Sequence, residues 1–205
     1  MILSHELAFP CLLAACADNG APSSNFGGTA MSNYPLRGGK ATLWEGGIRA
    51  TGFLWGRGVP AGANNTELFH CADWMPTFVA LAGGSIPASR QLDGYDIWKA
   101  ITKGAASPRT EILHNIDPGK GTSSKGAVRV GEYKLIIGQG QSGWGANPSP
   151  PFNPGGSPDE EDKGPWMFNV RRDPCERHNL IGDDRCAVLP SNITRDYKGL
   201  ALFSF

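Results

Sequence analysis

The longest apolar run of the chain extends from Leu7 to Ala17 and is followed at once by Asp18 and Asn19. A continuous apolar run predicts a buried strand, since a half-exposed strand would alternate. We therefore expect Cys11 to Ala17 to form a parallel strand that places Asp18 and Asn19 at its carboxyl end. The small residues Ala15-Cys16-Ala17 also resemble a signal-peptidase site, but no Lys or Arg precedes the run, so the strand is favoured.

Five later segments have the β-branched and aromatic content of strands. They are Ala50–Trp55, which follows a tight glycine turn, then Thr110–Asn115, the pair Ala127–Val130 and Tyr133–Ile137, and Trp166–Val170. The pair is separated by only a short turn at Gly131, so its strands must run antiparallel as a hairpin.

Helical spacing of apolar residues appears in two places. Trp74 to Ala82 predicts a helix with Asp73 as its N-terminal cap. A second helix begins at Asp93 or Asp96 and ends at Gly104. We expect both helices to pack their apolar residues on a sheet.

Composition indicates a loop-rich protein with a single sizeable core. The 205 residues include 28 Gly and 16 Pro, and 40% of the residues are hydrophobic. The long polar segment at residues 20–40 predicts a surface loop. Lys and Arg together number 19, as do Asp and Glu, so no net field attracts nucleic acid or an acidic membrane surface. No apolar run has the length of a membrane-spanning helix.

The five cysteines form no C-x-x-C pair, which argues against a zinc ribbon or a thioredoxin-type site. Cys175 and Cys186 could close a short disulfide loop. Two glycosylation sequons, Asn64-Asn65-Thr66 and Asn192-Ile193-Thr194, would matter in a secreted chain. No G-x-S-x-G nucleophile motif and no phosphate-binding glycine motif is present.

Four residues near the N-terminus carry candidate chemistry. Asp18 and Asn19 offer a carboxylate and an amide oxygen, the ligands that a hard cation such as calcium prefers. Asp-Asn-Gly is also common in turns, and these three residues alone favour the turn. Arg37 and Lys40 could present cations to an anionic substrate or could be ordinary solvated charges.

Two histidines are candidate bases. His70 precedes the predicted cap and His114 lies on a predicted strand. Neither has an activating partner that the sequence identifies, so packing or capping roles are favoured for both.

An ordered series of motifs, from Asp18 to about Leu180, resembles the sulfatase family, and its arylsulfatase B-like members in particular. These motifs are "ADNG", "YPLRGGKATLWEGGIRATGFLW", "ELFHCADWMPTFVALAG", "LDGYDIWKAITKG", "SPRTEILHNIDP", "AVRVGEYKLIIG" and "DPCERHNLI". The resemblance implies an α/β class with a partial alkaline-phosphatase-like fold and a C-terminal antiparallel β-hairpin subdomain.

The implied organisation has three parts. Residues 7–117 would be the C-terminal part of the α/β domain, and residues 118–180 the antiparallel subdomain. A mobile Gly/Pro-rich insertion would occupy 138–165 of that subdomain. Residues 181–205 would be an irregular tail.

The resemblance also implies a function, that of a sulfuric ester hydrolase with calcium and a formylglycine made from cysteine. In that family the Asp-Asn pair ligates the metal and the lysine contacts the substrate sulfate, which match Asp18, Asn19 and Lys40 here. The substrate of the full-length enzyme would be a sulfated small molecule or glycan. A lysosomal or secreted location would follow, although no convincing signal peptide is present.

Departures from the family pattern change the expectation for this chain. None of the five cysteines begins a C-x-P-S-R or C-x-A-x-R motif, so formylglycine is absent. The family's other metal ligands should lie upstream of Asp18, where only 17 residues stand. We therefore expect an incomplete calcium site, uncovered apolar faces and no turnover from this C-terminal portion. The alternative is a non-catalytic remnant that binds a sulfated glycan or a protein.

Overall fold

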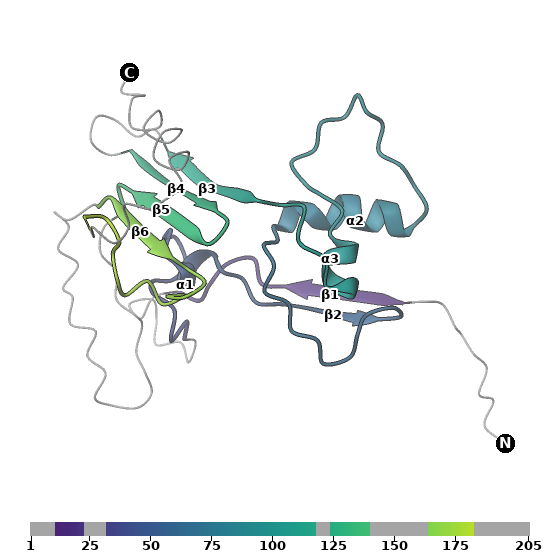
Figure 1. Ribbon diagram of the computed structural model, residues 1–205, viewed down its shortest axis with the longest axis horizontal. Helices are drawn as coiled ribbons and strands as arrows, with labels where there is room; N and C mark the ends of the chain where they lie inside the picture. The colour runs from purple at the N-terminus through teal and green to yellow at the C-terminus, as the bar shows by residue number, and fades with distance from the viewer. Residues whose placement is uncertain (1–10, 23–31, 118–123, 140–163, 183–205) are drawn as a thin grey trace. The chain divides into compact units, whose positions relative to one another are not determined.

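The computed structural model describes four stretches of the chain, residues 11–22, 32–117, 124–139 and 164–182 (Figure 1). They belong to two compact units. Unit one comprises Met1–Ala17 with Thr51–Thr110, and unit two comprises Asp18–Ala50 with Glu111–Phe205. The division predicted at residues 117 and 118 stays a prediction, and the insertion and the tail fall largely outside the described residues.

Unit one contains a two-stranded antiparallel sheet, made of β1 (Leu12–Cys16) and β2 (Gly52–Gly56). The predicted strand before Asp18 therefore exists, but the prediction of a buried parallel strand is wrong. Leu13 pairs with Trp55 and is 51% exposed. An apolar run shows that a segment suits a strand, whereas the direction of pairing depends on how the chain returns.

One face of this sheet is apolar and open to solvent. Leu13 and Trp55 are paired, and Phe53 lies two residues before Trp55, so all three side chains share a face. Phe53 is 59% exposed and Trp55 is 66% exposed. Within the described part of the chain, the expectation of uncovered apolar faces is confirmed.

The two predicted helices are present as α2 (Trp74–Leu81) and α3 (Trp98–Lys103). Asp96, rather than Asp93, begins α3, because its carboxylate accepts the Trp98 N–H at 2.9 Å. Gly104 ends α3 with a φ of 65°, a left-handed conformation that favours glycine.

The prediction that α2 packs its apolar residues on a sheet is wrong for three of them. Met75, Phe78 and Leu81 are 51%, 39% and 42% exposed. The buried side of α2 consists of Pro76 and Thr77 instead. Three large apolar residues of this helix are therefore exposed, whereas Trp74 and Val79 are half-buried.

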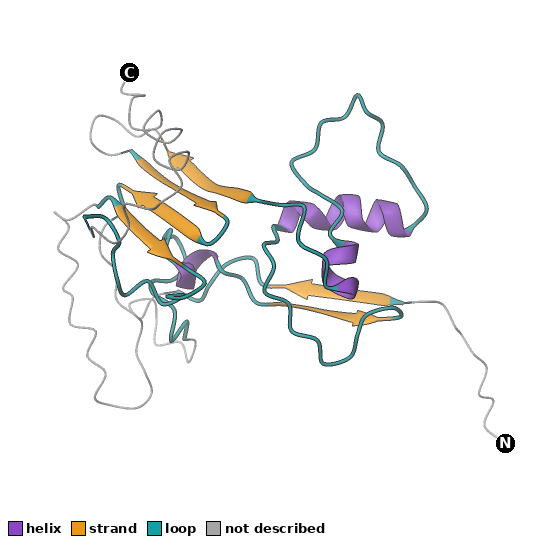
Figure 2. Ribbon diagram, in the orientation of Figure 1, coloured by secondary structure: helices purple, strands orange, loops and turns teal. Residues whose placement is uncertain are grey.

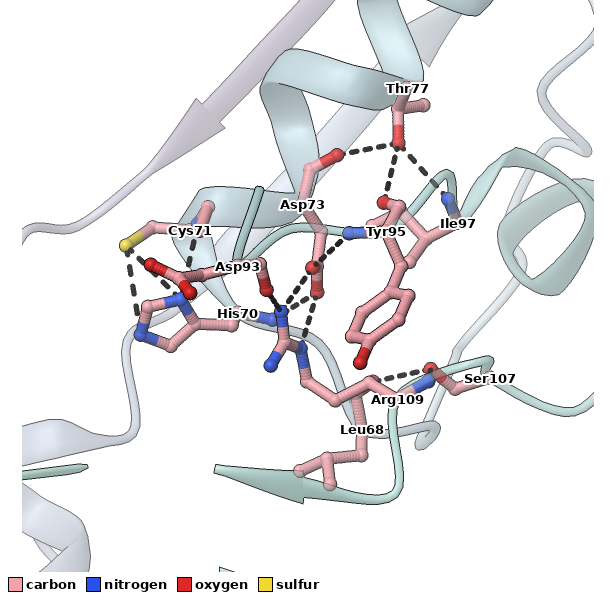
Figure 3. A network of polar contacts seen from close by, with 11 residues as sticks. Leu68, His70, Cys71, Asp73, Thr77, Asp93, Tyr95, Ile97, Ser107 and Arg109 are labelled. Carbon is pink, nitrogen blue, oxygen red and sulfur yellow. Dashed lines mark hydrogen bonds and ion pairs between the residues drawn. The ribbon is translucent and has the colours of Figure 1, made fainter. Parts of the chain in front are cut away.

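Asp73 holds together three loops around the start of α2 (Figure 3). Its fully buried carboxylate accepts the N–H groups of His70 at 2.8 Å and of Tyr95 at 2.9 Å. The Arg109 guanidinium donates to the same carboxylate, with Nε at 2.9 Å. Asp73 was expected to cap α2, but its side chain makes no cap bond to that helix.

The turn before α2 explains where the Asp73 side chain goes. Cys71–Asp73 form a 3-10 turn, so the Asp73 carboxylate reaches back to the His70 N–H instead of forward into α2. The Nδ1 atom of His70 accepts the Ala72 N–H at 3.2 Å. The prediction of a capping histidine is thereby confirmed.

Unit two contains a four-stranded antiparallel sheet in the order β3-β4-β5-β6, whose strands are labelled in Figure 1 and drawn in orange in Figure 2. Its strands are β3 (Glu111–Asp117), β4 (Lys125–Val130), β5 (Tyr133–Ile137) and β6 (Trp166–Asn169). The predicted hairpin is confirmed, with Gly131 at its turn in a left-handed conformation of φ 55°. The C-terminal antiparallel subdomain is thus present.

The core of unit two joins this sheet to a loop that precedes it in sequence. Trp44 is fully buried and lies edge-on to Trp166 and Phe168, with ring centroids 5.6 and 5.8 Å away. Ile136 completes the centre of this core. A four-residue helix, α1 (Glu45–Ile48), follows Trp44, where the sequence predicted a simple glycine turn.

No helix in the described stretches is long and apolar enough to cross a membrane.

The Asp73 network generates a stability prediction. Asp73→Asn removes the charge that faces the Arg109 guanidinium, and breaking a buried ion pair leaves its partner uncompensated. We expect the free energy of unfolding to fall by about 3 kcal/mol, measured by urea unfolding followed by circular dichroism.

Asp93→Asn is the matched control, because Asp93 is exposed and its backbone carbonyl, which accepts a hydrogen bond from Arg109, is kept in the variant. It should change the free energy of unfolding by less than about 0.5 kcal/mol. Equal losses in the two variants would show that the buried pair does not hold these loops.

Candidate functional site

The three residues implied by the family resemblance all belong to unit two. Asp18 and Asn19 form a bend directly after β1, where Asp18 is exposed and Asn19 is half-buried. Lys40 is exposed in the loop that leads to α1. The three side chains are therefore accessible to a ligand.

Backbone hydrogen bonds bring the Asp18 segment and the Lys40 loop together. The Lys40 N–H donates to the Ala21 carbonyl at 2.9 Å, and the Gly20 N–H donates to the Gly47 carbonyl at 2.9 Å. Asn19 lies two residues before Ala21, a span of at most about 7 Å of extended chain. The candidate site residues are consequently neighbours although 21 positions separate Asn19 from Lys40.

Asn33 ties the two segments more firmly. Its carboxamide oxygen accepts the Ala21 N–H at 2.7 Å, and its Nδ2 donates to the carbonyls of Ala21 at 2.8 Å and Gly38 at 3.1 Å. One side chain thus satisfies both backbone polar groups of Ala21 and reaches the loop before Lys40. The sequence offered no signal for this role.

Glycines allow these segments to approach closely. A Cβ on Gly20 would lie 1.7 Å from the Gly46 carbonyl oxygen, and one on Gly46 would lie 2.5 Å from the Arg37 carbonyl oxygen. Gly20 has no left-handed φ, so Asp-Asn-Gly is not a turn that needs glycine for its φ. Its glycine is required by backbone contact with α1.

The turn that carries Lys40 is closed by its own hydrogen bonds. The Thr42 hydroxyl donates to the Gly39 carbonyl at 2.7 Å, and the Thr42 N–H donates to the same oxygen at 3.0 Å. Ala41 has a left-handed φ of 69°, which is uncommon for a residue with a Cβ. This turn holds the Lys40 side chain on the surface.

Arg37 has a different position from the one the sequence suggested. Its sequence position suits a second surface cation, but only 6% of Arg37 is exposed. Its guanidinium lies 3.7 Å from the centroid of the Trp44 ring and donates to the Glu176 carbonyl at 3.3 Å. The Arg37 side chain is therefore packed against the core, because a guanidinium stacks well on an aromatic ring.

A buried ion cluster lies under the loop. The Nζ atom of Lys134 is 2.9 Å from Glu45 Oε1 and 2.8 Å from Glu176 Oε1, and all three side chains are almost completely buried. The other Glu176 oxygen accepts the Glu45 N–H at 2.6 Å. The first residue of α1 is therefore held both by its backbone and by its side chain.

The two carboxylates of this cluster respond differently to their surroundings. Burial is the largest influence on Glu176 and raises its pKa to about 7, with the nearby Glu45 adding to the rise and Lys134 opposing it. Burial also acts on Glu45, but the charge and hydrogen bond of Lys134 prevail and lower its pKa. Glu45 is thus the permanent counterion of Lys134.

The donor set at Asp18 and Asn19 falls short of a complete calcium site. Calcium takes about 6 to 8 oxygen ligands, and these two residues supply one carboxylate and one amide oxygen. Among the described residues there is no group of three or more His, Cys, Asp or Glu side chains that could hold a metal ion. Asp18 and Asn19 therefore supply only part of a calcium shell.

Other candidate residues of the sequence are distributed elsewhere. Asn64 of the first sequon is exposed, and His114 is half-buried on β3. Asn192 and Cys186 lie outside the described residues, so glycosylation at Asn192 and a bridge from Cys175 to Cys186 stay predictions.

Sequence reasoning missed the cluster of Lys134, Glu45 and Glu176. One signal was present: Lys134 stands in the apolar strand Tyr133–Ile137, at a position that faces the core. A lysine at an inward position requires a buried counterion, which sequence alone does not locate.

Comparison with curated proteins gives relatives that match about 80% of the chain. No family model matches it. The chain is 41% identical to mouse arylsulfatase J in an alignment of 188 positions that covers 80% of this chain and 31% of that protein. It is 31% identical to dog N-acetylgalactosamine-6-sulfatase in an alignment of 174 positions that covers 80% of this chain and 32% of that protein. Human arylsulfatase A is 30% identical over 172 residues, 83% of this chain and 33% of that protein.

The chain therefore spans about a third of the length of the curated relatives it matches.

Solved structures agree with this chain in fold. Ps i-CgsB, solved in complex with k-i-k-neocarrahexaose, superposes with a TM-score of 0.64 and 24% identity, covering 93% of this chain and 36% of that chain. The Bacteroides thetaiotaomicron protein BT33336S-sulf gives a TM-score of 0.59 with 19% identity, covering 93% and 38%.

Gly20→Ala tests whether close backbone contact assembles the site. The added Cβ would collide with the Gly46 carbonyl, so the Asp18 segment must move away from α1. We expect a loss of about 2 kcal/mol in the free energy of unfolding, measured in urea.

Gly52→Ala is the control for that substitution. Its Cβ would meet no atom closer than 3.4 Å, and Gly52 has no left-handed φ. It should lower the free energy of unfolding by less than about 0.5 kcal/mol, and a tolerated Gly20→Ala would contradict the contact described above.

Lys134→Met tests the buried cluster. The variant leaves two carboxylates in the core without a cation, so we expect the free energy of unfolding to fall by about 4 kcal/mol at pH 7.5. Lys125→Met on the exposed end of β4 is the control and should have little effect. If both variants unfold at the same urea concentration as the wild type, the cluster does not stabilise unit two.

Proposed function

Since this chain belongs to the sulfatase family and carries part of its alkaline-phosphatase-like α/β fold, we propose that it retains part of a sulfate-ester site. In this proposal Asp18 and Asn19 are two of the oxygen ligands of calcium, and Lys40 contacts the sulfate group. The observation that supports it most is the backbone bond from Lys40 to Ala21, which puts the two segments side by side.

Charge and exposure support the division of roles. Lys40 is exposed at the end of a closed turn, so its ammonium can meet an anion without first leaving a partner in the core. Asp18 is exposed as well and would repel a sulfate that approached without a cation. A cation held by Asp18 and Asn19 would remove that repulsion, so calcium and sulfate should bind in a mutually favourable way.

The proposal includes inactivity of the isolated 205-residue chain. None of its five cysteines lies in a formylglycine motif, so the chain supplies no nucleophile for the sulfur atom. Without that group, Lys40 can attract a sulfate but cannot cleave its ester. The chain would then act as the C-terminal part of a sulfatase site whose remaining groups come from residues not in this sequence.

The compartment and the substrate class belong to the same proposal. Ps i-CgsB was solved with k-i-k-neocarrahexaose, and we propose that a sulfated small molecule or glycan is also the ligand here. A lysosomal or extracellular location would suit the exposed Asn64 of the first sequon. No role with nucleic acid or membrane is proposed.

Capture of a sulfated glycan without cleavage is the alternative, and the structure supports it less. Glycan capture would require Arg37 and Lys40 to form a pair of surface cations. Arg37 is instead stacked on Trp44 in the core. A single exposed lysine gives weak attraction for a polyanion at physiological salt. Retention on heparin at 150 mM salt that is lost in Lys40→Ala would favour it.

The central test is ligand titration of the purified chain, observed by NMR of the backbone amides. With calcium and then 4-nitrophenyl sulfate added, we expect shifts at residues 18–21 and 39–42, with dissociation constants on the order of millimolar. Lys40→Ala should lose the sulfate response and keep the calcium response, while Asp18→Asn should weaken both.

Lys125→Ala is the control and should respond as the wild type does. Release of 4-nitrophenol should stay at the background rate. Calcium-dependent release above that rate would contradict the inactive chain, and the absence of any shift at these residues would contradict the retained site.

A further inference from the structure

The buried cluster of unit two carries more negative than positive charge when all its groups are ionised. Lys134 contributes one positive charge, and Glu45 and Glu176 contribute one negative charge each, at 2.9 and 2.8 Å from Nζ. An uncompensated charge in the interior is costly, and a carboxyl group can avoid that cost by binding a proton.

The surrounding charges leave Glu176 as the group that takes the proton. Arg37, from the loop before α1, donates to the backbone carbonyl of Glu176. Arg129 on β4 and His114 on β3 act on Glu45 and favour its ionised form. Lys134 on β5 is shared by both carboxylates. Glu45 is therefore the better stabilised anion.

We propose that Glu176 is a pH-sensitive clasp, which binds a proton as the pH falls below neutral and thereby relieves the repulsion between its carboxylate and that of Glu45 on α1. In its neutral form the Glu176 carboxyl leaves Glu45 and Lys134 as a simple ion pair. As an anion it shares the Lys134 ammonium with Glu45, so these three side chains together carry one excess negative charge, while the cation Arg129 acts on Glu45.

The clasp is linked to the candidate site through α1. Glu176 accepts the Glu45 N–H at 2.6 Å, and Gly47 of the same helix accepts the Gly20 N–H at 2.9 Å. A looser α1 would release the segment that carries Asp18 and Asn19. This inference concerns the folding of unit two and does not depend on the proposed sulfate binding.

The direction of the pH effect follows from proton uptake. Burial raises the pKa of Glu176 from 4.5 to about 7, so between these values the folded chain binds a proton that the unfolded chain does not. Stability should therefore decrease as the pH rises from about 4.5 to about 7 and then level off. Glu45, whose pKa is lowered, adds a loss of stability only when the pH falls below its ordinary value of 4.5.

Hydrogen exchange of the full chain, read by mass spectrometry, tests the clasp. Protection factors, corrected for the intrinsic exchange rate at each pH, are compared from pH 5 to pH 8. Peptides covering residues 32–49 and 166–180 should lose protection by roughly tenfold or more, whereas peptides from α2 in unit one should change by less than about threefold.

Two variants test whether Glu176 causes the pH-dependent loss of protection. Glu176→Gln cannot ionise, so its protection over residues 32–49 should be independent of pH between 5 and 8. Glu45→Gln removes a neighbour that raises the pKa of Glu176, so the loss of protection should begin at a lower pH. An unchanged pH response in Glu176→Gln would overturn the proposal.

A direct titration covers the case in which a variant does not fold. In the wild-type chain labelled with 13C-glutamate, the side-chain carboxyl signal of Glu176 should titrate near pH 7. A midpoint near the ordinary 4.5 in the folded protein would overturn the clasp whatever the variants do.

Discussion

The ammonium group of Lys134 inside unit two is the constraint on which the rest of the arrangement depends. Its two counterions come from α1 and from the turn after β6, 89 and 42 positions away in sequence. A buried cation without these partners would be strongly destabilising, so the cluster specifies that α1 and the last turn meet at β5. Trp44 then packs against Trp166 and Phe168 beside it.

Backbone contacts connect the candidate site to α1 and to the loop before it. The Gly20 N–H donates a hydrogen bond to the Gly47 carbonyl of α1. In the loop before α1, the Lys40 N–H donates to the Ala21 carbonyl. The absence of side chains at Gly20, Gly46 and Gly47 lets three segments come within contact distance. The positions of Asp18, Asn19 and Lys40 therefore depend on a core to which these residues do not belong.

Much of the secondary structure could be predicted from the sequence, because it depends on local periodicity and turn residues. The hairpin at Gly131 and the helices α2 and α3 follow from such patterns. The antiparallel pairing of β1 could not, since an apolar run carries no information about direction.

Side-chain partners distant in sequence were also beyond prediction. The position of Asp73 in the sequence suits a helix cap, but its ion pair with Arg109 determines where the side chain lies. The loop position of Arg37 suits a surface charge, but stacking on Trp44 places it in the core. The family motifs point to Asp18, Asn19 and Lys40 as site residues, which stays a prediction. They do not show the contacts by which Asn33, Glu45 and Glu176 hold the surrounding segments in place.

The account rests on one claim, that the Asp18 segment and the Lys40 loop form a single ligand site in this chain. Paramagnetic broadening by Mn²⁺, a hard cation that also takes oxygen ligands, tests it most directly. The account predicts that substoichiometric Mn²⁺ selectively broadens the amide signals of Asn19, Gly20 and Lys40, and that Asp18→Asn abolishes the effect. Broadening centred elsewhere, or confined to one segment with Lys40 unaffected, would contradict it.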